Sequence, residues 1–260
     1  MKMIKKICVV ALLGFFGLTG SASAEMSVLQ SSDFVGTTFW VASMGMIAAT
    51  AFFFVERGTV APAWKTSMTV AGLVTGIAFI HYMYMRNVWV QTDNVPAVYR
   101  YIEWIITLPL QIIQFYLILV AVRKVKNIIF WKLLSASLII VIFWYLGEAG
   151  HIHPFLAFIV GAGGWIYVLY EIFSGELSRL ALNSGNKAVV AAFGAMRMIV
   201  TVGWAIYPLT YIFGSLTSGI DTSTLNVVYN LADFVNKIVF GLFIWKAAMS
   251  NTSLSRSRRY

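Results

Sequence analysis

The chain has 260 residues, of which 60% are hydrophobic and only 11% are charged, and its formal net charge is +9. A composition this apolar excludes an ordinary soluble domain and indicates a membrane protein. The basic residues form no single patch interleaved with aromatic side chains, so the charge does not indicate nucleic-acid binding.

Residues 1–24 have the pattern of a cleavable secretory signal peptide. Lys2, Lys5 and Lys6 precede an apolar run, and the segment ends in small residues up to Ala24. A retained signal anchor is the alternative, but the run is shorter than the roughly 20 residues that a span needs. The only cysteine, Cys8, lies in this segment. The mature chain is therefore expected to have no disulfide and no thiolate metal site.

Seven apolar stretches follow, each near or above the spanning length. They run approximately over 34–55, 64–85, 97–122, 128–146, 154–173, 188–214 and 225–249. Most connections are short and contain Gly, Asn, Ser or Pro, as turns between packed helices do. The sequence therefore predicts an all-α membrane protein. One seven-transmembrane-helix bundle occupies residues 25–250, and a basic cytoplasmic tail follows over residues 251–260.

The charges in the connections predict the orientation of the bundle. With the mature N-terminus outside, the outer side receives Arg86 together with the acids Asp33, Asp93, Glu148 and Asp221. The basic residues that the cytoplasmic side receives are Arg57, Lys65, Arg123, Lys124, Lys126, Lys132, Arg179, Lys187, Lys246, Arg256, Arg258 and Arg259. This asymmetry predicts an N-out, C-in protein, with the lipid bilayer as its surroundings.

The stretch over 97–122 carries a polar stripe. Its members are spaced 3, 4, 4 and 3 residues apart, which places them on one face of a helix: Arg100, Glu103, Thr107, Gln111 and Gln114. Two charges on such a face predict a seam that is directed to the bundle interior. Because this helix runs inward, its two charged residues lie toward the outside and Gln114 lies toward the cytoplasm.

The last stretch holds a lysine in the middle of the span. Burying the Lys237 ammonium costs at least ~2.5–3.5 kcal/mol on insertion scales, so a partner or a chemical use is expected. Asp233 lies one turn earlier on the same face and can be that partner. One interpretation is an ion pair that only fixes helix packing. The other is an amine suited to form a Schiff base with a carbonyl compound.

Several long motifs, in order along the chain, closely resemble those of the proteorhodopsins, bacterial seven-helix retinal proteins. They are GLVTGIAFIHYMYMR (72–86), RYIEWIITLPL (100–110), FWYLGEAG (143–150), GWAIYP (203–208) and YNLADFVNKIVFG (229–241). The resemblance covers essentially all of the mature chain and leaves out the signal segment and the basic tail. It implies all-trans retinal in the bundle interior, held on Lys237 as a protonated Schiff base.

The resemblance also implies roles for individual residues. Glu103 would be the main counterion and proton acceptor, and Asp233 the second counterion. Arg100 would organise this cluster, and His81 would bond to the acceptor carboxyl. The residues that match the retinal pocket are Trp104, Thr107, Gln111, Trp204, Tyr207, Pro208 and Tyr229. Gln111 also matches the position that tunes colour, where glutamine goes with blue rather than green absorption.

Two residues depart from the family pattern. Glu103 stands where proteorhodopsins have aspartate, and Gln114 stands at the cytoplasmic donor position, where pumps of this family have a carboxyl group. An amide cannot give up a proton at working pH, so slow reprotonation is expected.

We expect a light-driven ion transporter and not a conventional enzyme, namely an outward proton pump with Glu103 as acceptor. The alternative is a photosensory rhodopsin with a slow photocycle and little or no transport. A third reading is a transporter without retinal, in which Lys237 and Asp233 form a gating pair. Chloride transport is disfavoured because Glu103 would repel an anion. Sodium transport is disfavoured because Thr107 offers no carboxylate where the sodium pumps carry one.

The remaining interpretations concern positions away from the lysine. His151 and His153 lack further ligands, so no metal site is expected. Trp40 matches a residue that meets a neighbouring protomer, which indicates a homo-oligomer, a pentamer or a hexamer. Phe158 replaces a glycine of antenna-carrying relatives, so no carotenoid antenna is expected. Arg197 either snorkels to the cytoplasmic edge or lines the inner half-channel.

Overall fold

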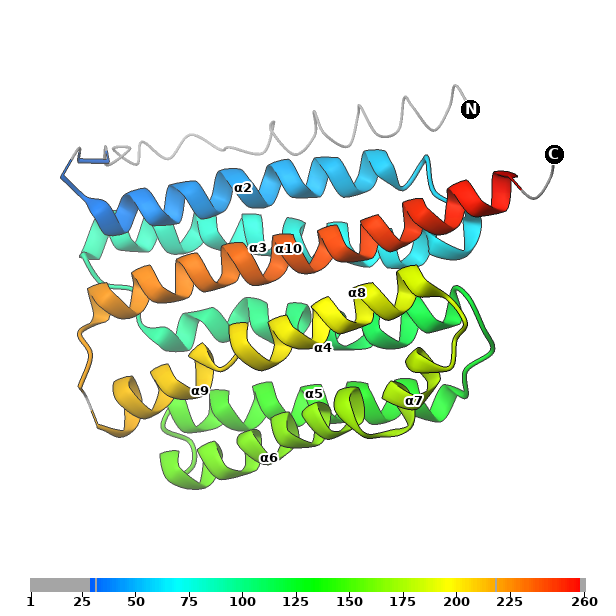
Figure 1. The fold of residues 1–260 in the computed structure, drawn as a ribbon. Coiled ribbons are helices and arrows are strands. Elements are labelled where there is room, and N and C mark those ends of the chain that lie inside the picture. Colours follow the sequence, from blue (N-terminus) through cyan, green and yellow to red (C-terminus); the bar gives the residue numbers. More distant parts are fainter. Residues whose placement is uncertain (1–28, 31, 218, 258–260) are drawn as a thin grey trace.

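A computed structural model shows the chain as a bundle of long helices that lie roughly side by side (Figure 1). The structure describes residues 29–30, 32–217 and 219–257, so the predicted signal segment and the last three residues lie outside the described part. Within these ranges every regular element is helical, and seven helical segments are long and apolar enough to cross a membrane. The predicted seven-helix class is confirmed.

The helices begin and end close to the predicted limits of the spans. The first five spans are α2 (Phe34–Glu56), α3 (Lys65–Thr92), α4 (Tyr101–Val120), α5 (Asn127–Glu148) and α6 (Pro154–Phe173). A short helix, α7 (Glu176–Leu182), precedes the sixth span, which contains α8 (Lys187–Met198) and α9 (Ile206–Thr210). The seventh span is α10 (Thr222–Ser257), which continues past residue 250, so the predicted tail begins as helix.

The sixth span is not one continuous α-helix. Two π-helical segments, Ile199–Gly203 and Tyr211–Leu216, lie on either side of α9. Pro208 lies inside this region, and a proline has no backbone N–H for the helical ladder. Two side chains from neighbouring helices bond to backbone carbonyls of the first π segment. The Trp165 Nε1 donates to the Val200 carbonyl at 3.1 Å, and the Asn236 Nδ2 donates to the Gly203 carbonyl at 3.1 Å.

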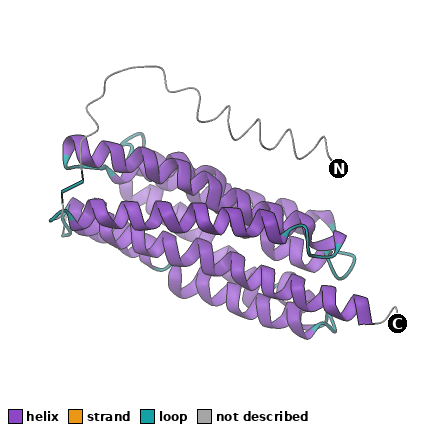
Figure 2. Ribbon diagram, turned by 90° about the horizontal axis from the view of Figure 1, so that it is seen from above, coloured by secondary structure: helices purple, strands orange, loops and turns teal. Residues whose placement is uncertain are grey.

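The helices pack against one another along their length, and short loops join their ends (Figure 2). α10 contacts α2, α3 and α8, while α4 packs against both α3 and α5. Large apolar side chains such as Val55, Ile166 and Val202 point away from the bundle and are more than half exposed. Such a surface suits hydrocarbon, because lipid tails are as apolar as these side chains.

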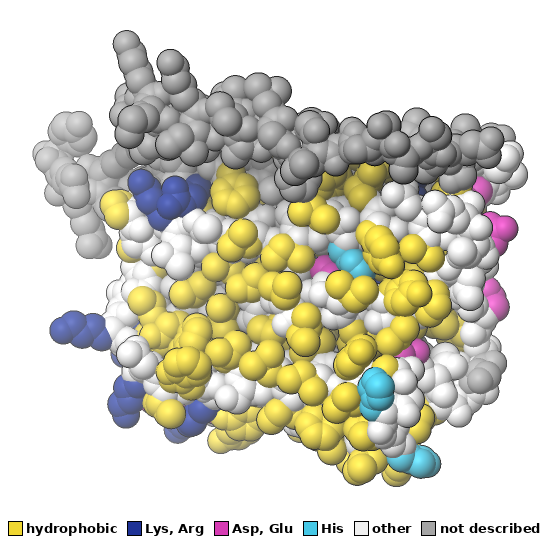
Figure 3. All heavy atoms as spheres, turned by 180° about the vertical axis from the view of Figure 1, so that it is seen from behind, with side chains coloured by type: hydrophobic (Ala, Val, Ile, Leu, Met, Phe, Trp, Pro, Cys, Tyr) yellow, Lys and Arg dark blue, Asp and Glu magenta, His cyan; other side chains and the backbone are white. Residues whose placement is uncertain are grey.

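The two ends of the bundle differ in charge. Figure 3 shows Lys and Arg side chains gathered at one end of the visible face and Asp and Glu side chains gathered at the other. Basic residues concentrate on the cytoplasmic side of membrane proteins. The distribution therefore agrees with the predicted N-out, C-in orientation.

Candidate functional site

Lys237 lies in the middle of α10 with two carboxylates beside its amine. Its Nζ is 2.7 Å from Oδ2 of Asp233 and 2.9 Å from Oε1 of Glu103. The three side chains are almost fully buried, with exposed fractions of 4% for Lys237, 1% for Glu103 and 0% for Asp233. The pairing that the spacing on α10 predicted is confirmed, and α4 supplies the second carboxylate.

Glu103 is held by its own helix. Thr107, one turn later on α4, donates its hydroxyl to Oε1 of Glu103 at 2.7 Å. The same oxygen faces the Lys237 amine, whereas the buried Oε2 has no hydrogen-bond partner. Glu103 therefore has an oxygen that is still free to take a proton.

Asp233 is much more fully bonded. Its Oδ1 accepts from the Tyr207 hydroxyl at 2.5 Å. Its Oδ2 accepts from the Tyr82 hydroxyl at 2.9 Å and the Trp104 Nε1 at 3.3 Å, in addition to Lys237. Hydrogen bonds to the ionised form favour that form. These hydrogen bonds therefore stabilise Asp233 as a carboxylate.

Arg100 organises the cluster through a tyrosine and not by a direct ion pair. Its NH1 lies 3.3 Å from the Tyr82 hydroxyl, which in turn bonds to Asp233. Its NH2 donates to Oδ1 of Asn226 at 2.7 Å and of Asn230 at 2.8 Å. Reasoning from the sequence missed these three partners. A signal was present, because positions 226, 230, 233 and 237 recur at helical spacing on α10.

His81 does not form the predicted bond to the acceptor carboxyl in this structure. Its ring is buried, but Nε2 of His81 and Oε2 of Glu103 both lack a hydrogen-bond partner. The other Glu103 oxygen is turned to Thr107 and Lys237, which leaves Oε2 as the only atom that could meet the histidine. A role of His81 at the acceptor stays a prediction.

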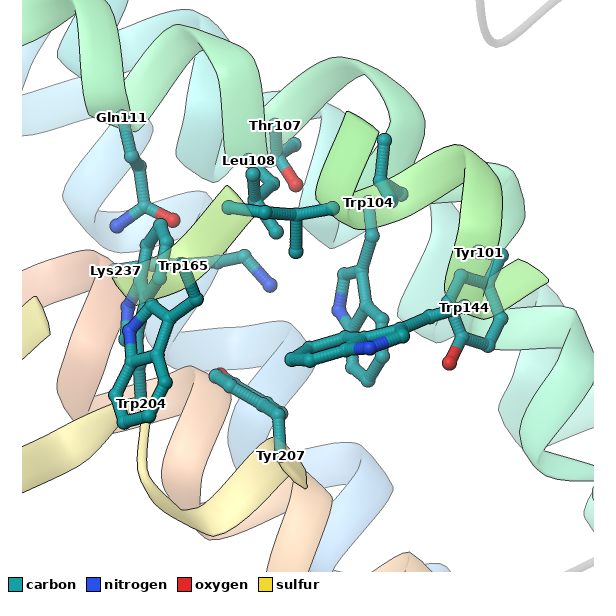
Figure 4. Close-up of a pocket in the computed structure, with 12 residues that line it drawn as sticks. Tyr101, Trp104, Thr107, Leu108, Gln111, Trp144, Trp165, Trp204, Tyr207 and Lys237 are labelled. Atoms are coloured by element: carbon teal, nitrogen blue, oxygen red, sulfur yellow. The ribbon is translucent and has the colours of Figure 1, made fainter. Parts of the chain in front are cut away.

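The amine of Lys237 borders an apolar pocket, whose volume is about 480 Å³ when all space between the lining atoms and the open space at its mouth are counted. Figure 4 shows the amine between Thr107 on one side and Tyr207 on the other, with Trp204 and Trp165 nearby. The residues that line the pocket are Tyr101, Trp104, Thr107, Leu108, Gln111, Ile140, Val141, Trp144, Trp165, Trp204, Tyr207 and Lys237.

Five of the predicted pocket residues line it, and two do not. Trp104, Thr107, Gln111, Trp204 and Tyr207 are at the wall. Tyr229 lies behind the wall, where its ring packs against Trp104 at 5.5 Å and against Tyr207 at 6.2 Å between centroids. Pro208 is buried in α9 and does not line the pocket. The expected contact of Tyr229 and Pro208 with the ligand stays a prediction.

Reasoning from the sequence also missed the residues that α5 and α6 contribute to the pocket wall, among them Trp144 and Trp165. Neither helix has a polar stripe that would have marked its inner face. The resulting pocket, aromatic on several sides and closed by one amine with charged partners, fits an elongated apolar carbonyl compound attached to Lys237.

The cytoplasmic side of the lysine is largely apolar. The rings of Phe115, Phe193 and Phe240 pack edge to face, with centroids 5.1 and 5.8 Å from Phe115 to the other two. Gln114 is buried, and its Nε2 donates to the Ser67 carbonyl at 2.9 Å. The predicted donor position thus holds an amide that is bonded to the backbone of α3.

Arg197, whose position the sequence left open, and Trp40, which was predicted to meet a neighbouring protomer, both have partners within the chain. The Arg197 guanidinium lies 4.9 Å from the Phe173 ring centroid, so it packs on the end of α6. Trp40 is 38% exposed on the lipid-facing surface, and the Arg86 guanidinium lies 4.8 Å from its ring centroid. The predicted oligomer stays a prediction.

Phe158 and the two outer histidines occupy the other end of α6. The Phe158 ring stacks on Tyr211 with centroids 5.8 Å apart. His151 and His153 are exposed just before α6, and in the described part of the chain no three His, Cys, Asp or Glu side chains gather as a metal site would require. The expectations about the antenna and the metal stay predictions.

Comparison with known proteins places this architecture in a family. The family model described as bacteriorhodopsin-like protein matches residues 33–251. The blue-light absorbing proteorhodopsin of Gamma-proteobacterium Hot 75m4 is 51% identical over 235 residues, which are 90% of this chain and 93% of that protein. The green-light absorbing proteorhodopsin of Gamma-proteobacterium EBAC31A08 is 50% identical over 226 residues, 86% of this chain and 90% of that protein.

A solved structure agrees with these relatives. The crystal structure of the blue light-absorbing proteorhodopsin from Med12 matches with a TM-score of 0.72 at 51% identity, covering 84% of this chain and 100% of that one. Seven helices around a buried lysine define a microbial rhodopsin, and the chain belongs to the bacteriorhodopsin-like family and, within it, to the proteorhodopsins. Members of this family carry retinal covalently on a lysine, and Lys237 is that lysine here. The ammonium nitrogen of Lys237 stands for the Schiff-base nitrogen of the retinal-bound protein.

Proposed function

We propose that this chain is a light-driven pump that moves protons outward across the inner membrane of a bacterium. The observation that carries the proposal is the one-sided placement of the acids around Lys237. Both carboxylates that contact its nitrogen, together with Arg100, belong to the outer half of α4 and α10. The inner half offers Gln114 and three phenylalanine rings.

Retinal, when bound, supplies absorption of visible light and a cationic nitrogen whose proton becomes transferable after illumination. Glu103 is the acceptor, because its Oε1 lies 2.9 Å from the Lys237 nitrogen and its Oε2 is without a partner. Thr107 keeps the carboxyl in place through the bond to Oε1. A base within hydrogen-bond reach of the proton is the first requirement for transfer.

Asp233 and Arg100 keep their charges throughout the proposed cycle. Asp233 stays ionised through its four donors and balances the cation at Lys237. The Tyr82 hydroxyl connects this carboxylate with the Arg100 guanidinium. The fixed positive charge of Arg100 favours the ionised form of a nearby carboxyl, and so favours loss of the proton that Glu103 receives.

Uptake from the cytoplasm is the slow part of the proposed cycle. Gln114 has no proton to give, and the rings of Phe115, Phe193 and Phe240 offer no relay. Reprotonation of the Lys237 nitrogen then depends on water or on another group and is slow. Gln111, whose amide borders the pocket, is the residue to which we assign the tuning toward blue light.

Illumination of retinal-supplied cells in an unbuffered medium tests the proposal. The pump predicts acidification of the medium that a protonophore abolishes. Cells that express Lys237→Ala serve as the control and show neither a visible band nor a pH change. An intact photocycle without a pH change would contradict the pump and support a photosensor.

A further inference from the structure

Arg197 carries a positive charge in the inner half of the sixth span, and the proposed pump makes no use of it. Its Cα lies on α8, ten residues after the first residue of that helix, Lys187. This separation is about 15 Å along the helix axis. The side chain is half-buried. A charge that begins at this depth is costly unless it reaches water or a counter-charge.

The guanidinium is directed to the cytoplasmic end of the bundle, where α8 meets α6. The Cζ of Arg197 lies 4.9 Å from the ring centroid of Phe173, which is the last residue of α6. Side chains of an α-helix lean toward the N-terminus of that helix, and for α8 this is the cytoplasmic end. The long side chain therefore reaches from the apolar zone to the level at which lipid headgroups begin.

No acid in the described part of the chain balances this charge. Among the residues that the structure describes, the only ion pairs are those of Lys237 with its two carboxylates. The side-chain hydrogen bond at Arg197 uses its backbone carbonyl, which accepts from the Thr201 hydroxyl at 2.7 Å. The buried acid near the end of α6, Glu171, accepts instead from the Tyr167 hydroxyl at 3.1 Å. The guanidinium donors are therefore left for a group outside the chain.

The surface beside the guanidinium is apolar and faces away from the bundle. Tyr170 and Phe173 on α6 and Met198 on α8 are all exposed large side chains. Tyrosine near the end of a span is typical of the boundary between hydrocarbon and water. Such a surface suits acyl chains, so a counter-charge that arrives on this side would belong to a lipid.

We infer that Arg197 and Phe173 form a binding site for the phosphate group of an anionic phospholipid in the cytoplasmic leaflet. A guanidinium fits a phosphate with two parallel hydrogen bonds, and the Phe173 ring fixes its plane from one face. Basic sites between spanning helices on the cytoplasmic side suit anionic headgroups, and this leaflet carries negative charge. A bound phosphate would hold the ends of α6 and α8 together, two residues before the π segment Ile199–Gly203.

Native mass spectrometry of the retinal-bound full chain tests the site, with phosphatidylglycerol as the anionic probe and phosphatidylcholine as the zwitterionic one. The parent protein should retain phosphatidylglycerol more strongly. Arg197→Gln should weaken this retention by about 5-fold or more, the factor that one arginine near a membrane surface contributes. Lys187→Gln is the matched control, because it removes an exposed charge of the same helix that lies on no aromatic ring. It should weaken retention less.

Phe173→Leu gives a second readout that does not depend on the folding of Arg197→Gln, and the visible band verifies that each variant is folded. It keeps the charge but removes the ring, so retention should fall less than in Arg197→Gln. Phosphatidylglycerol should also raise the temperature at which the parent loses its visible band, and should not do so in Arg197→Gln.

Three results would overturn the site. The first is equal retention of both lipids by the parent protein. The second is a loss of phosphatidylglycerol in Lys187→Gln that equals the loss in Arg197→Gln. The third is protection of the visible band by inorganic phosphate alone, which would assign the guanidinium to a free anion and not to a lipid. None of these measurements requires transport, so the site is tested independently of the proposed pump.

Discussion

The Tyr82 hydroxyl donates to Asp233 at 2.9 Å, and this one bond connects the carboxylate beside Lys237 with Arg100, which reaches no carboxylate directly. The NH2 group of the arginine donates to Asn226 and Asn230. The positive charge is thereby held on the outer side of the cluster without neutralising either acid. Glu103 and Asp233 both remain available to balance the nitrogen of Lys237.

The first prediction concerns the second carboxylate. In Asp233→Asn one negative charge beside the cationic nitrogen is lost. Less energy is then needed to move the positive charge from this nitrogen along the polyene on excitation. The absorption band should therefore move to longer wavelength. Tyr207→Phe keeps the charge of Asp233 and removes only one hydrogen bond from it, so it should not cause this shift to longer wavelength. Visible spectra of the purified variants measure both, and an unchanged band in Asp233→Asn would contradict the assignment.

The second prediction concerns Gln114. Gln114→Glu places a carboxyl at the cytoplasmic donor position and should accelerate reprotonation of the Lys237 nitrogen by about 10²-fold, the lower end of general acid catalysis. Gln114→Asn keeps an amide and should give no acceleration. Flash spectroscopy follows the decay of the deprotonated species in each. In the parent protein azide should speed this decay, and a decay that is already fast and insensitive to azide would contradict the role of the amide.

The third prediction concerns colour. Gln111 lines the pocket, and its Nε2 lies 3.4 Å from the Asn236 carbonyl. Gln111→Leu removes this dipole and should shift absorption from blue toward green. Replacement of the lipid-facing Ile105 by valine is a control on the same helix and should leave the band in place. A spectrum that does not distinguish the two variants would refute the tuning role.

The fourth prediction concerns the break in the sixth span. Asn236 is buried and donates to the Gly203 carbonyl at 3.1 Å and to the Tyr207 hydroxyl at 3.4 Å. Asn236→Ala leaves the carbonyl of the π segment without this donor, at a cost of about 1–3 kcal/mol. Thermal loss of the visible band should occur at lower temperature than in the parent. Val235→Ala is the control, because the Val235 side chain faces lipid and its truncation should lower this temperature little. Equal destabilisation by both variants would contradict the role of Asn236 in holding the π segment.

Parts of this architecture followed directly from the sequence. The seven spans are long apolar stretches, and the spacing of Arg100, Glu103 and Thr107 on one helical face correctly placed them in the interior. The pairing of Lys237 with Asp233 followed from their separation by one turn. These features are local, because helix geometry alone determines which side chains share a face.

The features that the sequence did not predict depend on contacts between helices. The bond from Tyr82 to Asp233 joins α3 to α10, and Trp144 enters the pocket from α5. The break in the sixth span depends on donors that Trp165 and Asn236 bring from two other helices. A pattern within one helix does not contain this information. Apolar helices in particular show no polar stripe that would reveal their inner face.

The central claim is that Glu103 takes the proton from the nitrogen of Lys237, because its Oε1 lies 2.9 Å away and Asp233 is already fully bonded. The most direct measurement compares Glu103→Gln with the parent protein, both with retinal, by flash spectroscopy and by the light-induced pH change of cells. The account predicts that Glu103→Gln forms no deprotonated species and produces no acidification, whereas Glu103→Asp keeps both. A Glu103→Gln protein that still deprotonated at Lys237 and acidified the medium would contradict it.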